Sequence, residues 1–311
     1  MSTDFVVSHR LAAVGLAVVC SALPASGQQQ ADPNFDAKVA KPAYTDKRPR
    51  VLFDEAHHNF HRADGRYKPF ADLIRNDGYH VVANPDKFET NTLAKADVLV
   101  IANALGAEQL NSPDAHKPAF TDDECDAVRD WVRGGGSLLL ITDHFPTGLA
   151  AAGLGKRFGI EMSGGATDEY TFTLDSGLGD HAILRGRSDA ERVKKIQTFT
   201  GQSLKGPKDA VAFITLPKDA VEKVPDEKEP FRGRPSEAPA GGRAQAIALE
   251  FGNGRVVVLG EAAMLTAQIA GPDKQPFGMN IPGIDNRQLA LNIMHWLSGL
   301  IGTEKRSNPD R

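Results

Sequence analysis

Short apolar runs alternate with amphipathic segments over the first half of the chain. The runs are rich in Val, Ile and Leu and lie at residues 50–56, 80–84, 97–104 and 137–143. Between them, residues 67–78 and 121–136 carry apolar side chains at helical spacing. Strands that are apolar on both faces and alternate with such helices are typical of a parallel sheet covered on both sides. The pattern predicts a flavodoxin-like α/β fold with a mostly parallel sheet and helices on both faces.

The segment 121–136 has the clearest helix boundaries. Thr121 is a good N-cap, and Glu124 three residues later completes the pattern of a capping box. Three consecutive glycines at 134–136 end the helix and allow a tight turn into the next strand. We therefore expect a helix here that leads directly into the strand at 137–143.

Strand patterns dominate after residue 150. Alternating or apolar stretches predict further strands at 167–176, 194–204 and 210–216, and two more within 243–262. The last two are joined by Gly252-Asn253-Gly254, which is a strong hairpin signal. Residues 286–301 carry an apolar stripe at helical spacing and predict a final helix that packs against the sheet. These are the additional C-terminal strands of the fold.

A single domain over residues 49–302 accounts for these elements. Residues 28–48 are polar and without periodicity, which predicts a flexible lead-in, and residues 303–311 form a tail. The stretch 217–243 mixes charge, Pro and Gly and predicts a long, mobile surface loop. The alternative is that this loop is a lid over a site.

The first 27 residues predict a secretory signal peptide. A basic start is followed by an apolar stretch and by Ala25-Ser26-Gly27, which suits cleavage after Gly27. The apolar stretch is shorter than the roughly 20 residues that a membrane-spanning helix needs. We expect an exported, periplasmic or extracellular protein without a membrane span after removal of the signal.

The composition of the chain limits the classes of binding partner that the sequence indicates. The chain has 311 residues, 41% hydrophobic and 24% charged, and a formal net charge of −4 without a Lys/Arg-rich stripe. Nucleic acid is therefore not indicated, and a small polar ligand or an envelope protein partner remains. Of the two cysteines, Cys20 lies in the predicted signal, so Cys125 would have no partner for an internal disulfide.

Acids and imidazoles gather where the predicted strands end. They are Asp54, Glu55, His57, His58 and His61 after the first run, Asn103 after the third, and Asp143 and His144 after the fourth. In an open parallel sheet, ligands bind beyond the carboxyl ends of the strands, where the strand order reverses. If the strand before Glu261 joins the sheet in parallel, this acid arrives at the same edge.

A metal centre is one use for these residues. His57 and His61 have helical spacing, and a shell of imidazole and carboxylate suits Zn or Fe, with Asp54, Asp143 or His144 completing it. No HExxH motif or other strict ligand spacing is present. The alternative is that these histidines are solvated or hydrogen-bonded within the protein.

General acid–base chemistry by Glu55 or by Asp143 with His144 is a second use. The alternative is that a strand-end Asp caps the loop or helix that follows it. Nucleophilic catalysis is not indicated, because no Gly-x-Ser-x-Gly or Gly-x-Cys-x-Gly turn is present, and Cys125 falls inside the helix at 121–136.

Six stretches of the chain resemble a known family. They are VLFDEAHHNFH, WVRGGGSLLLITDHFP, DHAILRGR, TFTGQSL and GRVVVLGEAAMLTAQ, followed by GMNIPGIDNRQLALNIMHWLSGL. Together they look like a family of uncharacterised exported bacterial proteins with the class I glutamine amidotransferase-like fold. That fold is also similar to trehalose-utilisation-type proteins and to domains of gliding-motility and intraflagellar-transport proteins, in which it serves binding or assembly.

The resemblance implies a site at the carboxyl edge of the sheet but no glutaminase activity, because His144 stands in the region where an amidotransferase has its elbow cysteine. The strand-end rule and the family motifs together give the catalytic candidates Glu55, Asp143, His144 and Glu261, the ligand-binding candidates Asp54, His58, Asn103, Gln202 and Asn280, and the metal candidates His57 and His61. Gln202, Asn280 and Asn286 have the alternative of organising loops.

Three hypotheses follow. The first is an exported ligand-binding or interaction domain with a polar pocket at the sheet edge. The second is a hydrolase, metal-assisted or not, that acts on a small polar or carbohydrate-like substrate. The third is an envelope-complex subunit whose fold has lost its site.

Overall fold

The computed structural model describes residues 29–46 and 48–302. The predicted signal peptide and the tail at 303–311 lie outside these residues. Within the described part of the chain, no helix has the length and apolar character needed to cross a membrane.

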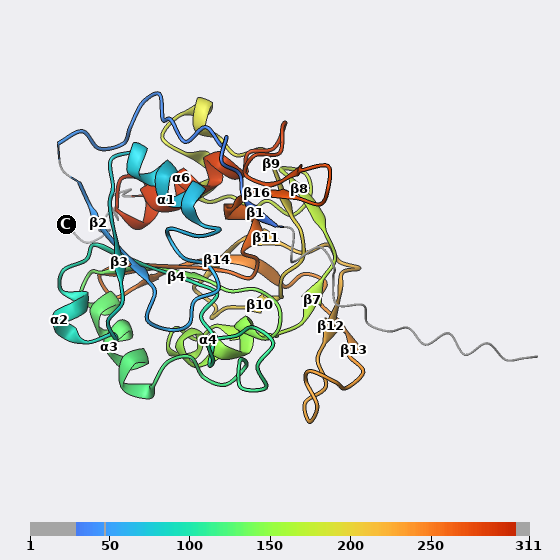
Figure 1. Cartoon of the computed structure of the whole chain (residues 1–311). Coiled ribbons are helices and arrows are strands. Elements are labelled where there is room, and N and C mark those ends of the chain that lie inside the picture. Colours follow the sequence, from blue (N-terminus) through green and yellow to red (C-terminus); the bar gives the residue numbers. More distant parts are fainter. Residues whose placement is uncertain (1–28, 47, 303–311) are drawn as a thin grey trace, which may run out of the picture.

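Five parallel strands form one half of a nine-stranded sheet (Figure 1). They are β2 (Arg50–Asp54), β3 (His80–Asn84), β4 (Val98–Ala102), β5 (Ser137–Ile141) and β15 (Gly254–Leu259). Their order is β3-β2-β4-β5-β15, and each neighbouring pair is parallel. Numbered by their place in the chain, they run 2-1-3-4-5, which is the flavodoxin-type order. The point at which this order reverses lies between β2 and β4.

The other half of the sheet is antiparallel. β14 pairs antiparallel with β15, with β10 and with β11, and β6 pairs with β10. The bounds are β6 (Glu161–Met162), β10 (Leu204–Lys205), β11 (Val211–Thr215) and β14 (Ala244–Phe251). The predicted hairpin at Gly252-Asn253-Gly254 is confirmed as the turn between β14 and β15. The sheet is therefore mixed, because its parallel part ends at β15.

Neighbouring residues on one strand enter two different cores. Val51 and Phe53 of β2 belong to a cluster with residues of α1 (Lys68–Asn76), α5 (Ala182–Arg185) and α6 (Asn286–Leu297). Leu52 belongs to a cluster that includes residues of α2 (Thr90–Leu93), α3 (Asp122–Arg133) and α4 (Thr147–Arg157). Side chains alternate along a strand, so each core lies on one face of the sheet. Figure 1 shows α1 and α6 on one side of it and α2, α3 and α4 on the other.

The helix predicted at 121–136 is confirmed as α3. The Thr121 side chain accepts the backbone N–H of Glu124, and the Glu124 side chain accepts the backbone N–H of Thr121. This reciprocal capping box satisfies two amide groups that would otherwise be unpaired. The final helix ends at Leu297, earlier than the predicted residue 301.

The segment before the sheet is docked on the domain, although its composition predicts a flexible lead-in. Its strand β1 (Gln30–Ala31) pairs with β16 (Ala267–Ala270), which pairs with β17 (Gln275–Gly278). Further along, the ring of Tyr44 packs edge-on against Tyr79 at 5.2 Å. Strand pairing and these contacts hold a segment that lacks its own apolar periodicity.

The stretch 217–243, predicted as a loop without regular structure, contains a β-hairpin. Its strands β12 (Val221–Val224) and β13 (Ser236–Pro239) pair with each other, and β12 also pairs with β7 (Ala166–Thr167). The prediction failed because these strands carry Glu, Lys and Pro, so no periodic apolar face is visible. The tip of the hairpin brings Phe231 to the ring of Phe145, with centroids 4.7 Å apart. Two smaller elements, the strand pair β8 (Tyr170–Thr173) and β9 (Lys195–Thr198) and the 3₁₀ helix Ala263–Leu265, complete the fold near the sheet edge.

Candidate functional site

The carboxyl ends of the parallel strands bring distant segments together. The backbone N–H of Phe60 donates to the carbonyl of Asn103, and the N–H of Asn103 donates to that of Ile141. The N–H of Thr142 in turn donates to the carbonyl of Leu259. The segments that follow β2, β4, β5 and β15 are thus joined side by side, which is where an open α/β sheet binds ligands.

A buried group of polar residues follows β2. We call Asp54, His57, Asn59 and Glu124 the sealed cluster. The Nδ1 atom of His57 lies 2.9 and 3.0 Å from the two carboxylate oxygens of Asp54, and its Nε2 lies 2.9 Å from Oε1 of Glu124. The Asn59 amide donates to Asp54 at 2.9 Å. All four residues are at most 7% exposed, so every polar partner of this imidazole is inside the protein.

In the sealed cluster, both ring nitrogens of His57 face carboxylate oxygens. Burial works to lower the pKa of His57, but the hydrogen bonds and charges of Asp54 and Glu124 outweigh it and raise this pKa above its usual value. Burial would raise the pKa of Glu124, yet hydrogen bonds from Thr121 and His57 bring it to about 2. The rings of Phe88 and Phe120 pack on the imidazole at 4.6 and 4.7 Å. Because both ring nitrogens donate to carboxylates, His57 has no free nitrogen for a metal or a ligand.

A second group lies where β5 and β15 end. We call His61, Tyr67, Asp143, His144 and Glu261 the edge cluster. The Tyr67 hydroxyl donates to the carbonyl of Ala262 at 2.7 Å, and the ring of His61 lies 4.8 Å from the Tyr67 ring. The backbone N–H of Ala262 lies 3.4 Å from Oδ2 of Asp143. One continuous chain of contacts therefore connects these residues.

Glu261 and Asp143 share one site as two carboxyl groups. Burial, and then the charge of Asp143, raise the pKa of Glu261 well above its usual value. The two oxygens of Glu261 accept the backbone N–H groups of Ala263 and Met264 at 2.8 and 2.7 Å. The same burial and the same two acids raise the pKa of Tyr67. The pKa of Glu261 is thus raised by its burial and by its position beside a second carboxyl group.

His61 and Asn103 contribute buried polar atoms without partners. His61 Nδ1 and Asn103 Oδ1 have no hydrogen bond in the structure. Burial, with a smaller effect of the Arg66 charge, lowers the pKa of His61 to about 3, so its ring is neutral at physiological pH. Asn103 has a φ of 50°, a left-handed conformation that is uncommon for non-glycine residues and that Asn adopts more readily than most. Unsatisfied atoms of this kind are uncommon in proteins and mark a place where an outside group can bind.

His144 is the exposed member of the edge cluster. Its side chain is 41% exposed, and its Nε2 lies 3.7 Å from Oδ1 of Asp143. Its Nδ1 lies 2.8 Å from the carbonyl of Phe145, whose ring contacts Phe231 of the hairpin and His116. An imidazole, a carboxylate and aromatic rings therefore meet at the surface here.

Several predicted site residues have partners that give them a structural role. Glu55 binds Arg62 at 2.6 Å and accepts the N–H of Ala63, and His58 is exposed with a φ of 48°. Gln202 donates to the Thr142 hydroxyl at 2.8 Å and to the Asp143 carbonyl at 3.0 Å. Asn280 and Asn286 bond to backbone groups of neighbouring segments, as expected for residues that organise loops.

The predicted metal ligands do not form a ligand shell. In residues 29–46 and 48–302, no group of three or more His, Cys, Asp or Glu side chains could hold a metal ion. Both ring nitrogens of His57 lie against carboxylates, and the neutral ring of His61 could give a metal ion only one nitrogen. The remaining thiol is no nucleophile either, because burial raises the pKa of Cys125 to about 11.

Three residues of these clusters do not stand out in the sequence. Glu124 reads as a helix cap, and nothing in the local pattern indicates that it also binds His57. Asn59 stands among the histidines after β2 without a distinct signal. Tyr67 precedes α1 and continues its apolar stripe, so its position beside two acids depends on the long-range packing of α1 against the segment after β15.

No family model matches this chain, and no curated protein matches it either. Solved structures do match. The structure named mmIFT52 N-terminal domain aligns with a TM-score of 0.55 and 14% identity over 80% of this chain and 97% of that chain. A ThuA-like protein from Parabacteroides merdae aligns with a TM-score of 0.46 and 12% identity over 83% and 93%. A GMP synthase protein from Thermoplasma acidophilum gives 0.44 and 10% over 82% and 97%. The predicted resemblance is confirmed at the level of the fold.

Proposed function

We propose that this chain is an exported ligand-binding domain whose ligand contacts the edge cluster. The observation that carries the proposal is the combination of an exposed imidazole and carboxylate at His144 and Asp143 with the unpartnered buried atoms of His61 and Asn103. A small polar ligand that reaches this edge would supply the missing hydrogen bonds. We further propose that the domain is flavodoxin-like in its use of the strand-order reversal between β2 and β4.

Binding fits the geometry better than catalysis does. Glu261 has the pKa shift that an acid catalyst requires, but it is fully buried and both its oxygens accept backbone amides. His57 is committed to two carboxylates, and Cys125 is a buried, protonated thiol. Among the described acids and imidazoles of the edge cluster, Asp143 and His144 are the least buried pair, which a ligand would meet first, and this pair can orient a polar group without breaking a bond.

A hydrolase is the second candidate. It is favoured by the 3.7 Å separation of His144 Nε2 and Asp143 Oδ1, from which a water molecule could be activated. For an enzyme of this kind, the substrate would be a small polar or carbohydrate-like molecule. Metal content of the purified mature protein tests the metal-assisted version, which requires close to one equivalent.

A thermal-shift screen of small polar compounds tests the proposal. Ligands of the edge cluster should raise the melting temperature of the wild type but not of Asp143→Asn. Asp130→Asn is the matched control, because it makes the same chemical change at a carboxylate that is 55% exposed and lies near the end of α3, which leads into the amino end of β5. Compounds that stabilise the wild type and Asp143→Asn equally would contradict the proposed site.

The compounds that pass this screen also separate the two candidate functions. Each is incubated with the wild-type protein and followed by NMR. An unchanged compound supports a binding domain, and cleavage that is lost in His144→Ala supports the hydrolase.

A further inference from the structure

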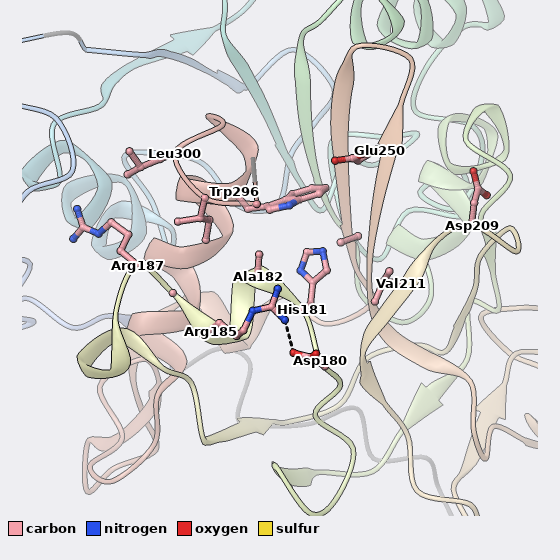
Figure 2. Close-up of a pocket in the computed structure, with 14 residues that line it drawn as sticks. Asp180, His181, Ala182, Arg185, Arg187, Asp209, Val211, Glu250, Trp296 and Leu300 are labelled. Carbon is pink, nitrogen blue, oxygen red and sulfur yellow. Dashed lines mark hydrogen bonds and ion pairs between the residues drawn. The ribbon is translucent and has the colours of Figure 1, made fainter. Parts of the chain in front are cut away.

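A cavity lies at the other end of the parallel strands. Its volume is about 740 Å³, and it is lined by residues of α5, α6, β11 and β14 and by the turn before β11 (Figure 2). Glu250, one of the lining residues, pairs with Arg255 at the start of β15, which places the cavity at the amino ends of the strands. The volume is within the range of about 300 to 1,000 Å³ that is typical of small-molecule sites. None of the residues of the edge cluster lines it.

The charges that line this cavity are separated. Arg185 and Arg187 come from the end of α5 and the residues after it, whereas Asp209 and Glu250 come from the turn before β11 and from the end of β14. Figure 2 shows Arg187 at one side, Glu250 and Asp209 toward the other, and Arg185 between them, where it is joined to Asp180. A cavity with opposite charges at its two ends is complementary to a ligand that carries both charges.

His181 stands between these two sides. Its Nδ1 accepts the backbone N–H of Ile183, which leaves the proton on Nε2. This Nε2 has no hydrogen-bond partner among the described residues. Burial, and then the charges of Arg185 and Arg255, lower the pKa of His181 to about 4, although Asp180 works in the opposite direction. The ring is therefore a neutral donor in a positive field, which favours an anionic acceptor.

The arginine side can accept that anion. Arg187 is held by Glu191, whereas Arg185 pairs, among the residues that the structure describes, only with Asp180, through one of its two terminal nitrogens. The Arg185 side chain is 43% exposed and that of Asp180 is 88% exposed. An ion pair in such a solvated position contributes little and can rearrange when a second carboxylate arrives. The ion pair with Asp180 therefore leaves Arg185 able to bind a second carboxylate.

The opposite side offers a carboxylate for a cation. Asp209 is exposed and has no ion pair or hydrogen bond among the described residues, and Glu250 adds a second acid near Arg255. Between the two sides, Val211, Ala248 and Leu300 give the wall an apolar surface, and Trp296 packs edge-on against His181 at 5.2 Å. The middle of the cavity is thus suited to aliphatic groups.

We propose that this cavity binds a short zwitterionic peptide, with its carboxylate at Arg185 and the Nε2–H of His181 and its ammonium group at Asp209. A single amino acid would leave much of the volume empty, whereas a tripeptide with aliphatic side chains can reach both ends. The site is separate from the edge cluster and does not depend on the function proposed for it.

Calorimetric titration with the tripeptide leucyl-alanyl-leucine at pH 7 tests this proposal. We expect saturable binding to the wild-type protein and a loss of affinity of about three- to tenfold in each of Arg185→Gln and Asp209→Asn. Both side chains are exposed, so these variants should fold. The Asp143→Asn variant at the other end of the sheet should bind as the wild type does.

Peptides with a blocked N-terminus or C-terminus show which terminal charge of the peptide binds at Arg185 and which at Asp209. N-acetylation should weaken binding to the wild type but change little in Asp209→Asn, and C-terminal amidation should weaken it but change little in Arg185→Gln. Absence of saturation up to about 10 mM peptide would overturn the proposal. Binding that is insensitive to both substitutions would also overturn it. Binding that amidation weakens and acetylation does not would overturn it as well, because it would indicate a site for an anion alone.

Discussion

Two groups of acids and imidazoles lie at the same edge of the sheet and differ in how their hydrogen bonds are satisfied. In the sealed cluster, His57 has a carboxylate on each ring nitrogen, and Asn59 supports one of them. In the edge cluster, His61 Nδ1 has no partner, and burial beside Asp143 raises the pKa of Glu261. A network in which every hydrogen bond is made stabilises one arrangement of the chain. A network with unpaired donors or acceptors can still bind a group from outside.

The difference shows that density of titratable residues in a sequence does not identify the functional ones. His57 and His61 are four positions apart, yet the pKa of His57 is raised and the pKa of His61 is lowered to about 3. What separates them is a residue from another element, Glu124 of α3, which reaches only His57. Substitutions and pH titrations can test whether the two clusters differ in this way. The largest effect is expected for His57.

Replacing His57 by Ala should cost about 3 to 5 kcal/mol of unfolding free energy, because it leaves two buried carboxylates without their cation. Urea denaturation at pH 7 measures this. His58→Ala is the control, since His58 is exposed and its replacement should stay within about 0.5 kcal/mol. Similar small losses in both variants would show that the sealed cluster does not contribute to stability as described.

The pH dependence of stability should reveal His61. Its folded pKa of about 3 lies below the unfolded value of 6.5, so the unfolded chain binds a proton first and stability falls as the pH drops below 6.5. Between pH 6.5 and 5 the loss from this group is about 2 kcal/mol. His61→Phe, which keeps a ring against Tyr67, should reduce this slope. An unchanged slope would mean that His61 is protonated in the folded protein.

The same measurements should show an opposite trend for His57. Its folded pKa is raised, so its stabilisation is complete below about pH 6.5 and is lost as the pH rises through the folded value. The variant His57→Ala should therefore lack the loss of stability that the wild type shows on the alkaline side. If wild type and variant lose stability in parallel there, the raised pKa is not present.

Asp143→Asn should lower the pKa of Glu261, because it removes the nearby negative charge. The raised pKa makes stability fall as the pH rises through the folded value, since the unfolded chain releases the proton earlier. The variant should regain about 1 kcal/mol at pH 8 relative to the wild type. Asp209→Asn, with the same change at an unpaired surface carboxylate, should show no such gain.

The smallest effect on stability is expected from His144. Because its side chain is 41% exposed, His144→Ala should change the unfolding free energy by less than about 0.5 kcal/mol. Its effect should instead be on affinity for ligands found by the thermal-shift screen. A variant that binds these ligands like the wild type would remove His144 from the site.

The fold could be predicted from the sequence where local pattern and long-range packing agree. The apolar runs became β2 to β5, the Gly252-Asn253-Gly254 turn became a hairpin, and Thr121 with Glu124 capped α3. The pattern failed for the hairpin of β12 and β13, whose pairing depends on partners such as β7 and not on an apolar face. It also missed the docking of residues 29–46, which takes place through β16 and Asp77.

The position of the candidate site could be predicted from the sequence, but the different roles of its residues could not. Parallel strands bring Asp54, Asp143 and Glu261 to one edge, and the order of apolar runs suffices to predict this. Whether a side chain at that edge is satisfied depends on elements far away in the sequence. Glu124 closes one cluster and Tyr67 lines the other, and both read locally as ordinary helix residues.

The histidine ring nitrogens provide the most direct test of the central claim that the edge cluster, and not the sealed cluster, meets the ligand. In ¹⁵N-labelled protein, long-range ¹H–¹⁵N spectra are recorded with and without a ligand from the thermal-shift screen. The account predicts that the signals of His61 and His144 move while His57 keeps the signature of a doubly protonated ring. Movement of His57 with unchanged His61 and His144 would contradict it.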